Sequence, residues 1–253
     1  MNPTYIGLSV FGFSSAGFLL GMWLQTTLPS HHLSAESRDT VKVGIGLIAT
    51  MTALVLGLVT ASAKSSFDDV DRAVKKTATD ALTLDRTLAR YGPETGEIRN
   101  SLRKAFAQRT EELWQPGHSR IENLDPASHL SRAEGISVAI RGLEPHDDTQ
   151  RALQSRALDR VEGLLEARWL VSGLEGASFP MPFLAVLLCW LTIIFISFGL
   201  FAPRNALVVL VLLVCALSVG SAVFLVLELQ APFDGLIRVS DAPWRFVLTH
   251  LNK

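Results

Sequence analysis

A stripe of small and hydroxyl-bearing side chains runs along the uncharged segment of residues 43–63, and its spacing could serve ion passage. The stripe recurs at intervals of three and four residues, which places its members on one face of a helix. In lipid, such a face allows close helix packing, which periodicity alone favours. The sharper hypothesis is that several copies surround a pore, with threonine hydroxyls and exposed backbone facing water or ions. The stripe consists of Gly46, Ala49, Thr50, Ala53, Gly57, Thr60, Ala61 and Lys64, and all except Ala49 are candidate pore-lining residues.

Four carboxylates next to apolar segments are the candidate ion-attracting residues. Asp68 and Asp71 follow the stripe, and in an oligomer they would form an acidic ring at a pore mouth that attracts cations. A solvated helix start is the simpler interpretation of the same two residues. Glu228 ends the last apolar segment, and Asp234 follows it in a turn. Because a carboxylate at a membrane boundary is costly when alone, Glu228 is expected to pair with Lys64 or Arg238, with cation binding as the alternative.

The sequence carries no pattern typical of catalysis. It has no nucleotide-binding loop, no metal-ligand box and no nucleophile–base arrangement. Cys189 and Cys215 lie in apolar segments, where small apolar filler is a simpler role than a disulfide or a metal site. The balanced charge of the polar region gives no sign of nucleic-acid binding. We therefore predict no enzyme activity, no cofactor and no catalytic or metal-binding residues.

Four segments without Asp, Glu, Lys or Arg have the length needed to cross a bilayer, which is about 20 apolar residues. They lie within residues 3–30, 43–63, 176–203 and 205–227. The first lacks a positive leader and is longer than a signal-peptide core, so it is expected to be an uncleaved membrane helix. Residues 64–179 hold 17 of the 23 Lys and Arg and 19 of the 24 Asp and Glu. The charges therefore gather in one polar region between the second and third spans.

The predicted fold class is an all-α membrane protein with four transmembrane helices and a cytoplasmic helical bundle inserted between helices 2 and 3. The expected domains are residues 1–63 for transmembrane helices 1 and 2, 64–175 for the bundle, 176–229 for transmembrane helices 3 and 4, and 230–253 for a turn and a short amphipathic helix. Lys and Arg near the span ends favour a cytoplasmic bundle with both termini on the same side. The expected location is a bacterial inner membrane.

The second span is expected to continue into the bundle as one unbroken helix that ends at Gly92-Pro93. No Pro or Gly interrupts residues 64–91, and apolar residues recur at alternating intervals of three and four, as in a coiled-coil seam. The seam consists of Phe67, Val70, Val74, Thr77, Ala81, Leu84, Leu88 and Tyr91. Thr and Ala occupy three of the eight positions, so packing against bundle partners is favoured over a long isolated coil.

Three further bundle helices and one short final helix are predicted from the same periodicity. The first covers residues 94–114, with Ile98, Leu102, Phe106 and Leu113 facing inward. A short helix covers residues 131–143, and a long one runs from a cap at Asp147 or Asp148 to about Gly173, with Leu153, Leu158, Val161, Leu165 and Trp169 inward. The final helix is capped by Ser240 or Asp241. Its apolar face, consisting of Trp244, Val247, Leu248 and Leu251, should lie at the membrane surface or against the bundle.

Several stretches together resemble the bestrophin-like family of bacterial membrane proteins of unknown function. They are HHLSAESRDTVKVGIGLIATMTALVLGL, ASAKSSFD, LDRTLARYGPE and PFDGLIRVSDAP, and the resemblance covers nearly the whole chain. It implies kinship with bestrophins, which are ring-shaped oligomeric ion channels with four membrane helices and a large cytoplasmic helical part. The implied partners are the lipid bilayer, further copies of the chain and inorganic ions. An acidic calcium-clasp run and an aromatic pore neck are not evident, and the soluble region is smaller, so calcium gating and anion selectivity do not transfer.

Two functions are compatible with these patterns. The first is an oligomeric ion channel in which helix 2 lines the pore and the bundle forms a vestibule. The second is a non-conducting membrane scaffold or sensor whose bundle binds a cytoplasmic partner. The second is motivated by the lack of acidic or basic residues in the middle of the spans, where many transporters and pumps carry them.

Overall fold

The computed structural model of the chain describes residues 2–29, 35–114, 126–175 and 181–252, and within them every regular element is a helix. The helices form two compact units, one of residues 1–65 and 178–230 and one of residues 66–177 and 231–253. The helix α2 contributes residues to both units. The elements are α1 (Pro3–Thr27), α2 (Ala35–Tyr91), the 3₁₀ helix η2 (Pro93–Thr95), α3 (Gly96–Trp114), α4 (Pro126–Arg141), α5 (Asp148–Glu175), α6 (Met181–Phe201), α7 (Ala206–Leu229) and α8 (Ala242–His250).

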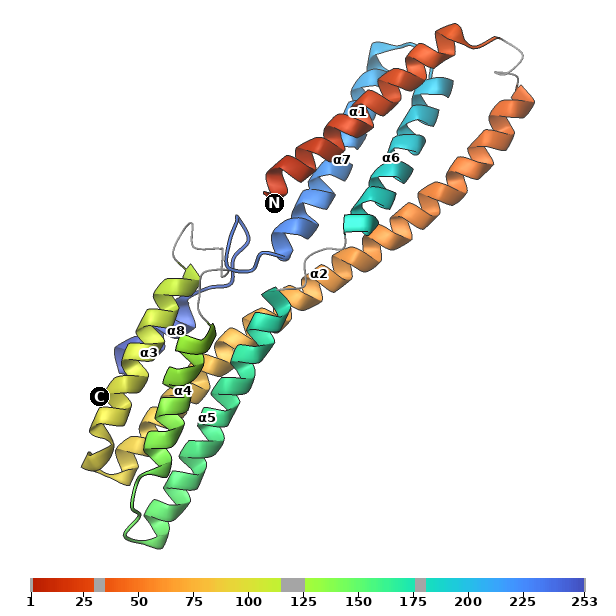
Figure 1. Ribbon diagram of the computed structural model, residues 1–253. Helices are drawn as coiled ribbons and strands as arrows, with labels where there is room; N and C mark the ends of the chain where they lie inside the picture. Colours follow the sequence, from red (N-terminus) through yellow and green to blue (C-terminus); the bar gives the residue numbers. More distant parts are fainter. Residues whose placement is uncertain (1, 30–34, 115–125, 176–180, 253) are drawn as a thin grey trace. The chain divides into compact units, whose positions relative to one another are not determined.

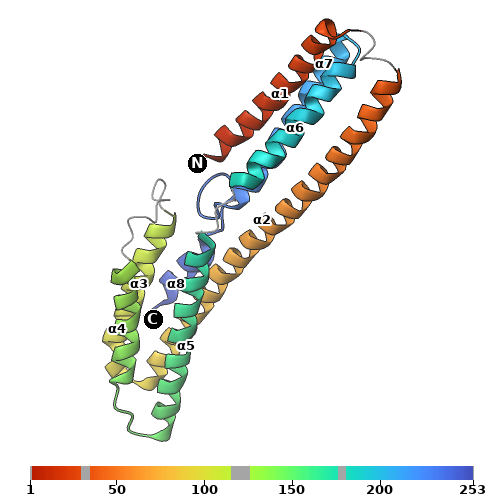
Figure 2. The same cartoon turned by 45° about the vertical axis from the view of Figure 1, so that its right-hand side comes forward.

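The first unit is built around α1, which lies against both α6 and α7 (Figures 1 and 2). The buried side of α1 follows a helical spacing of three and four residues, and it consists of Gly7, Val10, Ser14, Gly17, Phe18 and Gly21. Four of the described helices are long and apolar enough to cross a membrane: α1, the first part of α2, α6 and α7. This agrees with the four predicted apolar segments in length and composition.

Glycines bring the backbones of α1 and α6 into direct contact. A Cβ atom added at Gly21 would lie 2.0 Å from the carbonyl oxygen of Ile196, and one added at Gly199 would lie 2.0 Å from that of Phe18. Real side chains do not approach a backbone oxygen this closely, so only glycine fits at either position. Gly17 and Gly21 are four residues apart, and this spacing of small residues is the known signal for close helix contact in lipid.

The second unit packs the charged part of α2 against α3, α4, α5 and α8. The predicted seam of α2 is confirmed, because six of its eight residues are buried and only Phe67 and Thr77 are half-buried. All four predicted inward residues of α3 are buried as well. On α5, Val161 is buried, but Leu153, Leu158 and Leu165 are only half-buried, and the side chain of Trp169 lies outside the described residues. The fully buried Ala157 was not predicted.

Several predicted helix ends differ from the observed ones. The helix expected to start at residue 94 begins at Gly96, because Pro93–Thr95 forms a separate 3₁₀ turn closed by the Thr95 hydroxyl, which lies 2.7 Å from the Leu88 carbonyl oxygen and 2.8 Å from that of Gly92. The helix expected over 131–143 runs instead over Pro126–Arg141. Cap geometry decides the start of α5, where the Gln150 N–H donates to the Asp147 carboxylate at 2.6 Å.

The segment after α7, residues 231–252, folds onto the second unit and is called the strap below. Its residues Val239, Trp244, Val247 and Leu251 are buried in the core of that unit. The Trp244 ring stacks on Phe106 with ring centroids 4.2 Å apart. Of the two positions expected for the apolar face of the last helix, the structure therefore places it against the bundle.

Candidate functional site

The apolar half of α2 packs within the first unit through one narrow face. Thr52 and Ala63 are buried on this covered face, and Val55 and Leu56 pack against the cluster of Val10, Leu187, Leu191 and Val223. Only 6% of the most apolar window of α2 is buried, compared with 33% for α1 and for α6. Two further faces of α2 are therefore left open by the subunit itself.

One open face is the small-residue stripe. The seven candidate pore-lining residues, Gly46, Thr50, Ala53, Gly57, Thr60, Ala61 and Lys64, are all exposed. A Cβ atom added at Gly46 or Gly57 would meet nothing within 4 Å. The hydroxyls of Thr50 and Thr60 donate to the carbonyls of Gly46 and Leu56 in the preceding turn, at 2.8 and 2.7 Å. The structure thus places the stripe along one exposed surface of α2.

The other open face carries bulky apolar side chains. Leu47, Met51, Leu54 and Leu58 are between 47% and 69% exposed. Counted at about 100° per residue, the centres of the stripe and of this bulky face lie about 120° to either side of the covered face. The apolar half of α2 therefore has three distinct sides, and its own subunit contacts one of them.

The four candidate ion-attracting carboxylates have different surroundings. The Asp71 carboxylate pairs with the Lys75 ammonium at 2.6 Å, so its charge is balanced within its own helix. Asp68 is half-buried at the same end of the segment. Glu228 is buried at the end of α7, and Asp234 is half-buried in the turn of the strap, where its N–H donates to the Ala231 carbonyl at 3.0 Å. Asp68 and Asp71 thus lie close along one helix, and Asp71 brings its own counter-charge.

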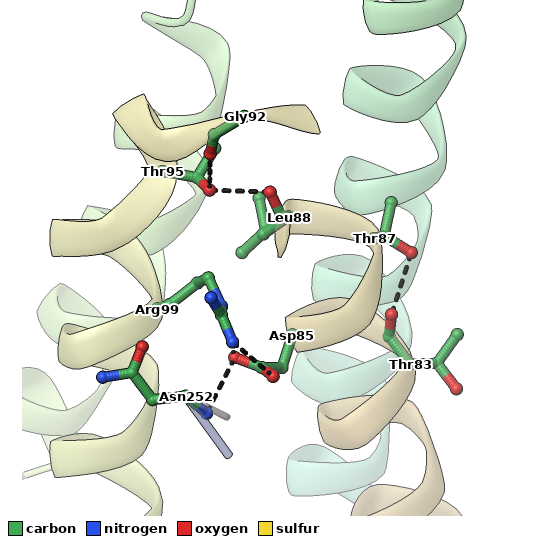
Figure 3. A network of polar contacts seen from close by, with 8 residues as sticks. All are labelled: Thr83, Asp85, Thr87, Leu88, Gly92, Thr95, Arg99 and Asn252. Atoms are coloured by element: carbon green, nitrogen blue, oxygen red, sulfur yellow. Dashed lines mark hydrogen bonds and ion pairs between the residues drawn. The ribbon is translucent and has the colours of Figure 1, made fainter. Parts of the chain in front are cut away.

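A buried ion pair in the second unit was not found by sequence reasoning. Figure 3 shows the fully buried Asp85 carboxylate of α2 facing Arg99 of α3. The Arg99 guanidinium donates from Nε and Nη2 to the two carboxylate oxygens, at 2.8 and 3.1 Å. The backbone N–H of Asn252 donates to the same carboxylate at 3.3 Å. The hydrogen bond to Asp85 raises the pKa of the Arg99 guanidinium, although burial acts in the opposite direction.

Two tryptophans fasten the strap at other points. The Trp244 indole N–H donates to the carbonyl of Val74 on α2 at 2.9 Å. The Trp114 indole N–H of α3 donates to the carbonyl of Val239 in the strap, also at 2.9 Å. Buried indole N–H groups need such acceptors, because an unpaired donor in an apolar core is costly. The strap is thus bonded to α2 through Trp244 and Asn252 and to α3 through Val239.

At the end of α2, burial raises the pKa of the Tyr91 phenol, and the nearby carboxylates of Glu94, Asp147 and Glu144 raise it further. Cys189 and Cys215 are free thiols on α6 and α7. Within the described ranges no group of three His, Cys, Asp or Glu side chains is arranged to hold a metal ion.

The sequence profile of the bestrophin-like domain matches residues 12–244. This chain belongs to the bestrophin-like family. The match includes the whole of α2 and reaches into α8, so the open faces of α2, the buried ion pair of Asp85 and most of the strap lie within the matched region of this bestrophin-like protein. No curated protein matches the chain in sequence.

Solved structures share the fold of this bestrophin-like chain. A bacterial bestrophin homologue from Klebsiella pneumoniae is 14% identical, with a TM-score of 0.65 over 92% of this chain and 95% of that one. A mutant of a bestrophin homologue from the same organism is 16% identical, with a TM-score of 0.68 over 97% of this chain and 96% of that one. At such identities the likeness establishes the fold. Side-chain roles have to come from the residues of this chain.

Proposed function

We propose that this bestrophin-like protein is an oligomeric ion channel of the bacterial inner membrane. Each copy contributes α2, whose small-residue stripe lines the conduction path. The chain crosses the membrane with α1, α2, α6 and α7, and the bundle inserted between α2 and α6 forms a cytoplasmic vestibule, with both termini on the same side. The observation that carries this proposal is the exposed stripe of α2, together with membership of the bestrophin-like family, whose kinship with bestrophins implies a channel.

Small side chains in a membrane helix are useful where another backbone approaches closely, or where water reaches the helix. Within this subunit the close approaches are made by glycines of α1, α6 and α7, whereas nothing approaches Gly46 or Gly57. Copies arranged around an axis would give the stripe an aqueous side. The oxygens of Thr50 and Thr60 retain lone pairs that can face permeating ions.

The three sides of α2 suit a helix in a ring. The covered face packs on its own subunit, the bulky face is apolar enough to meet a neighbouring copy, and the stripe faces the axis. The lining is uncharged until Lys64, and Asp68 and Asp71 follow at the cytoplasmic end. Between Gly46 and Ala61 an ion would therefore meet no fixed charge of the lining.

Ion flux through purified protein in liposomes tests the proposal. Wild-type vesicles are expected to conduct, and Gly57→Leu and Thr60→Leu are expected to block the path, because each adds bulk to the stripe at a position that is exposed in the subunit. Leu210→Phe is the matched control, since this exposed α7 residue lies off the path. Electrically silent wild-type vesicles under varied voltage and ion composition would refute the proposal. A soluble partner lost on deletion of residues 94–146 would then favour a scaffold.

A further inference from the structure

The exposed side of the charged half of α2 is positively charged. From Arg72 to Arg90, seven positions of this helix are exposed, and five of them are lysine or arginine. The two acidic residues of the same stretch, Asp80 and Asp85, are buried and paired with arginines of α5 and α3. The five exposed cations are called the basic row below, and they are Arg72, Lys75, Lys76, Arg86 and Arg90.

Most of the basic row has no opposite charge within its own subunit. The Arg72 guanidinium is paired with Asp69, and the Lys75 ammonium lies 2.6 Å from the Asp71 carboxylate. Within the part of the chain that the structure describes, no carboxylate pairs with the other three cations, which are Lys76, Arg86 and Arg90. These three side chains are therefore available to a negatively charged surface outside the subunit.

An exposed side of α5 carries the complementary charge. Its three acids are called the acidic row below, and their spacing of three and four residues places them on one face of the helix. They are Asp159, Glu162 and Glu166, and among the described residues none of them is in an ion pair. Counted at about 100° per residue, the exposed Arg156 and Arg160 lie about 90° and about 130° from the centre of this row. The row is therefore a separate, acidic face of α5.

Both rows contain like charges four residues apart. Such neighbours lie side by side on a helix and destabilise it, unless an opposite charge lies between them. On α2 these pairs are Arg72 with Lys76 and Arg86 with Arg90, and on α5 the pair is Glu162 with Glu166. Opposite charges supplied by another molecule would relieve the repulsion in both rows.

Contacts within the second unit show which positions of α2 and α5 are level with each other. The two helices lie side by side there (Figures 1 and 2). The Gln150 side chain donates to the Tyr91 carbonyl at 3.0 Å, and the Arg160 guanidinium donates to the Asp80 carboxylate at 3.1 Å. The helices are therefore antiparallel, and level positions have residue numbers that add up to about 240.

This register brings the two rows to the same level. Lys76 of α2 is level with the stretch of α5 between Glu162 and Glu166. Arg86 lies about five residues, or about 7 Å along the helix, beyond the level of Asp159. Rotation of a copy about an axis parallel to the helices changes the level of no residue. The match therefore also holds between the α2 of one copy and the α5 of a neighbouring copy.

We propose that the basic row of α2 in one copy binds the acidic row of α5 in the next copy. The partner of both rows is thus a second copy of this chain. Each copy offers its basic row to one neighbour and its acidic row to the other, which is the heterologous contact from which closed rings are built. This inference rests on the oligomer of the proposed function, and it adds which surfaces of the second unit hold neighbouring copies in register. Charged contacts of this kind fix partner choice and register more than affinity.

Cross-linking between differently tagged chains tests the contact directly. The full-length protein is used in mild detergent, with Cys189 and Cys215 replaced by alanine. Chains with Lys76→Cys and chains with Glu166→Cys are co-expressed and treated with a short bifunctional thiol reagent. We expect dimers that contain both tags, and none from either variant alone. Lys104→Cys is the matched control for Lys76→Cys, because Lys104 is an exposed cation of α3 outside both rows.

Charge reversal tests whether the opposite charges carry the contact. Lys76→Glu places like charges between the copies, and it is expected to raise the protein concentration at which the oligomer dissociates by about fivefold. Glu166→Lys should have a similar effect, and the two changes together should restore most of the wild-type value. Lys104→Glu should leave the dissociation unchanged. Mass photometry over a dilution series measures all four variants.

The outcomes separate this inference from the channel proposal. An oligomeric wild type without mixed-tag dimers would overturn the inference alone, and so would a loss in Lys76→Glu that Glu166→Lys does not restore. Release of a different, acidic protein by Lys76→Glu, with the oligomer intact, would assign the basic row to that partner and overturn it too. An oligomer with the expected cross-links that stays silent in liposomes would refute conduction and leave the contact between copies standing.

Discussion

The contact between α1 and α6 gives the most direct test of the packing described above. Replacing Gly21 with alanine places a Cβ atom 2.0 Å from the Ile196 carbonyl oxygen, about 1.4 Å closer than an ordinary contact. The neighbour is backbone, so no rotamer change relieves the clash and the two helices must separate. Overpacking of this kind costs about 3 kcal/mol, and the better helix propensity of alanine returns about 1 kcal/mol. The expected net loss is about 2 kcal/mol.

Thermal unfolding in mild detergent, followed by loss of helical circular dichroism, measures this effect. A net loss of about 2 kcal/mol corresponds to a fall in Tm of about 4 to 8 °C for a chain of this size. Gly12→Ala is the control on the same helix, because a Cβ atom at Gly12 meets nothing within 4 Å. It should leave Tm unchanged or raise it slightly.

A double variant gives a second test of the contact between α1 and α6. Gly199→Ala clashes with the Phe18 carbonyl oxygen at the same crossing, also at 2.0 Å. Once the helices have separated for one alanine, the second needs little further movement, so the double variant should lose clearly less than the sum of the single losses. If Gly21→Ala unfolds at the same Tm as Gly12→Ala, the backbones of α1 and α6 do not approach each other as closely as described.

Three further predictions concern the second unit. Asp85→Asn should lower the free energy of unfolding by about 3 kcal/mol, because it leaves a mostly buried guanidinium without its carboxylate. Asp80→Asn should lower it by less than about 1 kcal/mol, because its arginine partner is half exposed. Denaturant titration measures both losses, and equal losses would contradict both predictions. Gly92→Ala should destabilise the protein by about 1 to 3 kcal/mol, because Gly92 has a φ of 152°, a backbone conformation that residues with a side chain rarely adopt. Gly96→Ala is the control and should be neutral or stabilising, because Gly96 has helical backbone with open space around it. With the other tyrosine replaced by phenylalanine, a phenolate absorbance titration should place the pKa of Tyr91 above 10.0, and a midpoint at or below that value would refute its burial. Since the unfolded chain loses this proton first, the stability that Tyr91 contributes is complete below pH 10 and is lost as pH rises through the folded pKa.

The regular features of this fold are readable from the sequence because they repeat locally. The seam of α2 and the inward face of α3 follow from apolar spacing, and Gly92-Pro93 ends α2 where expected. The start of α4 was missed by five residues, because Pro126 begins a helix whose first turns are polar and carry no apolar period. Apolar periodicity thus predicts the buried face of a helix well, but it predicts the ends of a helix poorly where those ends carry few apolar residues.

The polar contacts of the core lie beyond such reasoning for a different reason. Asp85 bonds residues 14 and 167 positions away, and nothing in its neighbourhood distinguishes it from the exposed acids of the same helix. Small-residue patterns were ambiguous in another way. The Gly17–Gly21 pair is used for contact inside the subunit, whereas the similarly spaced stripe of α2 is not, and the sequence pattern is the same for both. Which helix meets a neighbour is decided by the fold.

The buried seam of α2 also restricts how the gene can change in length. One codon inserted between Val74 and Ala81 would rotate the rest of the helix by about 100°, so that Leu84 and Leu88 would turn out of the core. Eleven codons would lengthen the helix by three whole turns and restore the alignment. Related genes should therefore tolerate substitutions in this stretch far better than small insertions or deletions, unless three-turn blocks are gained or lost whole.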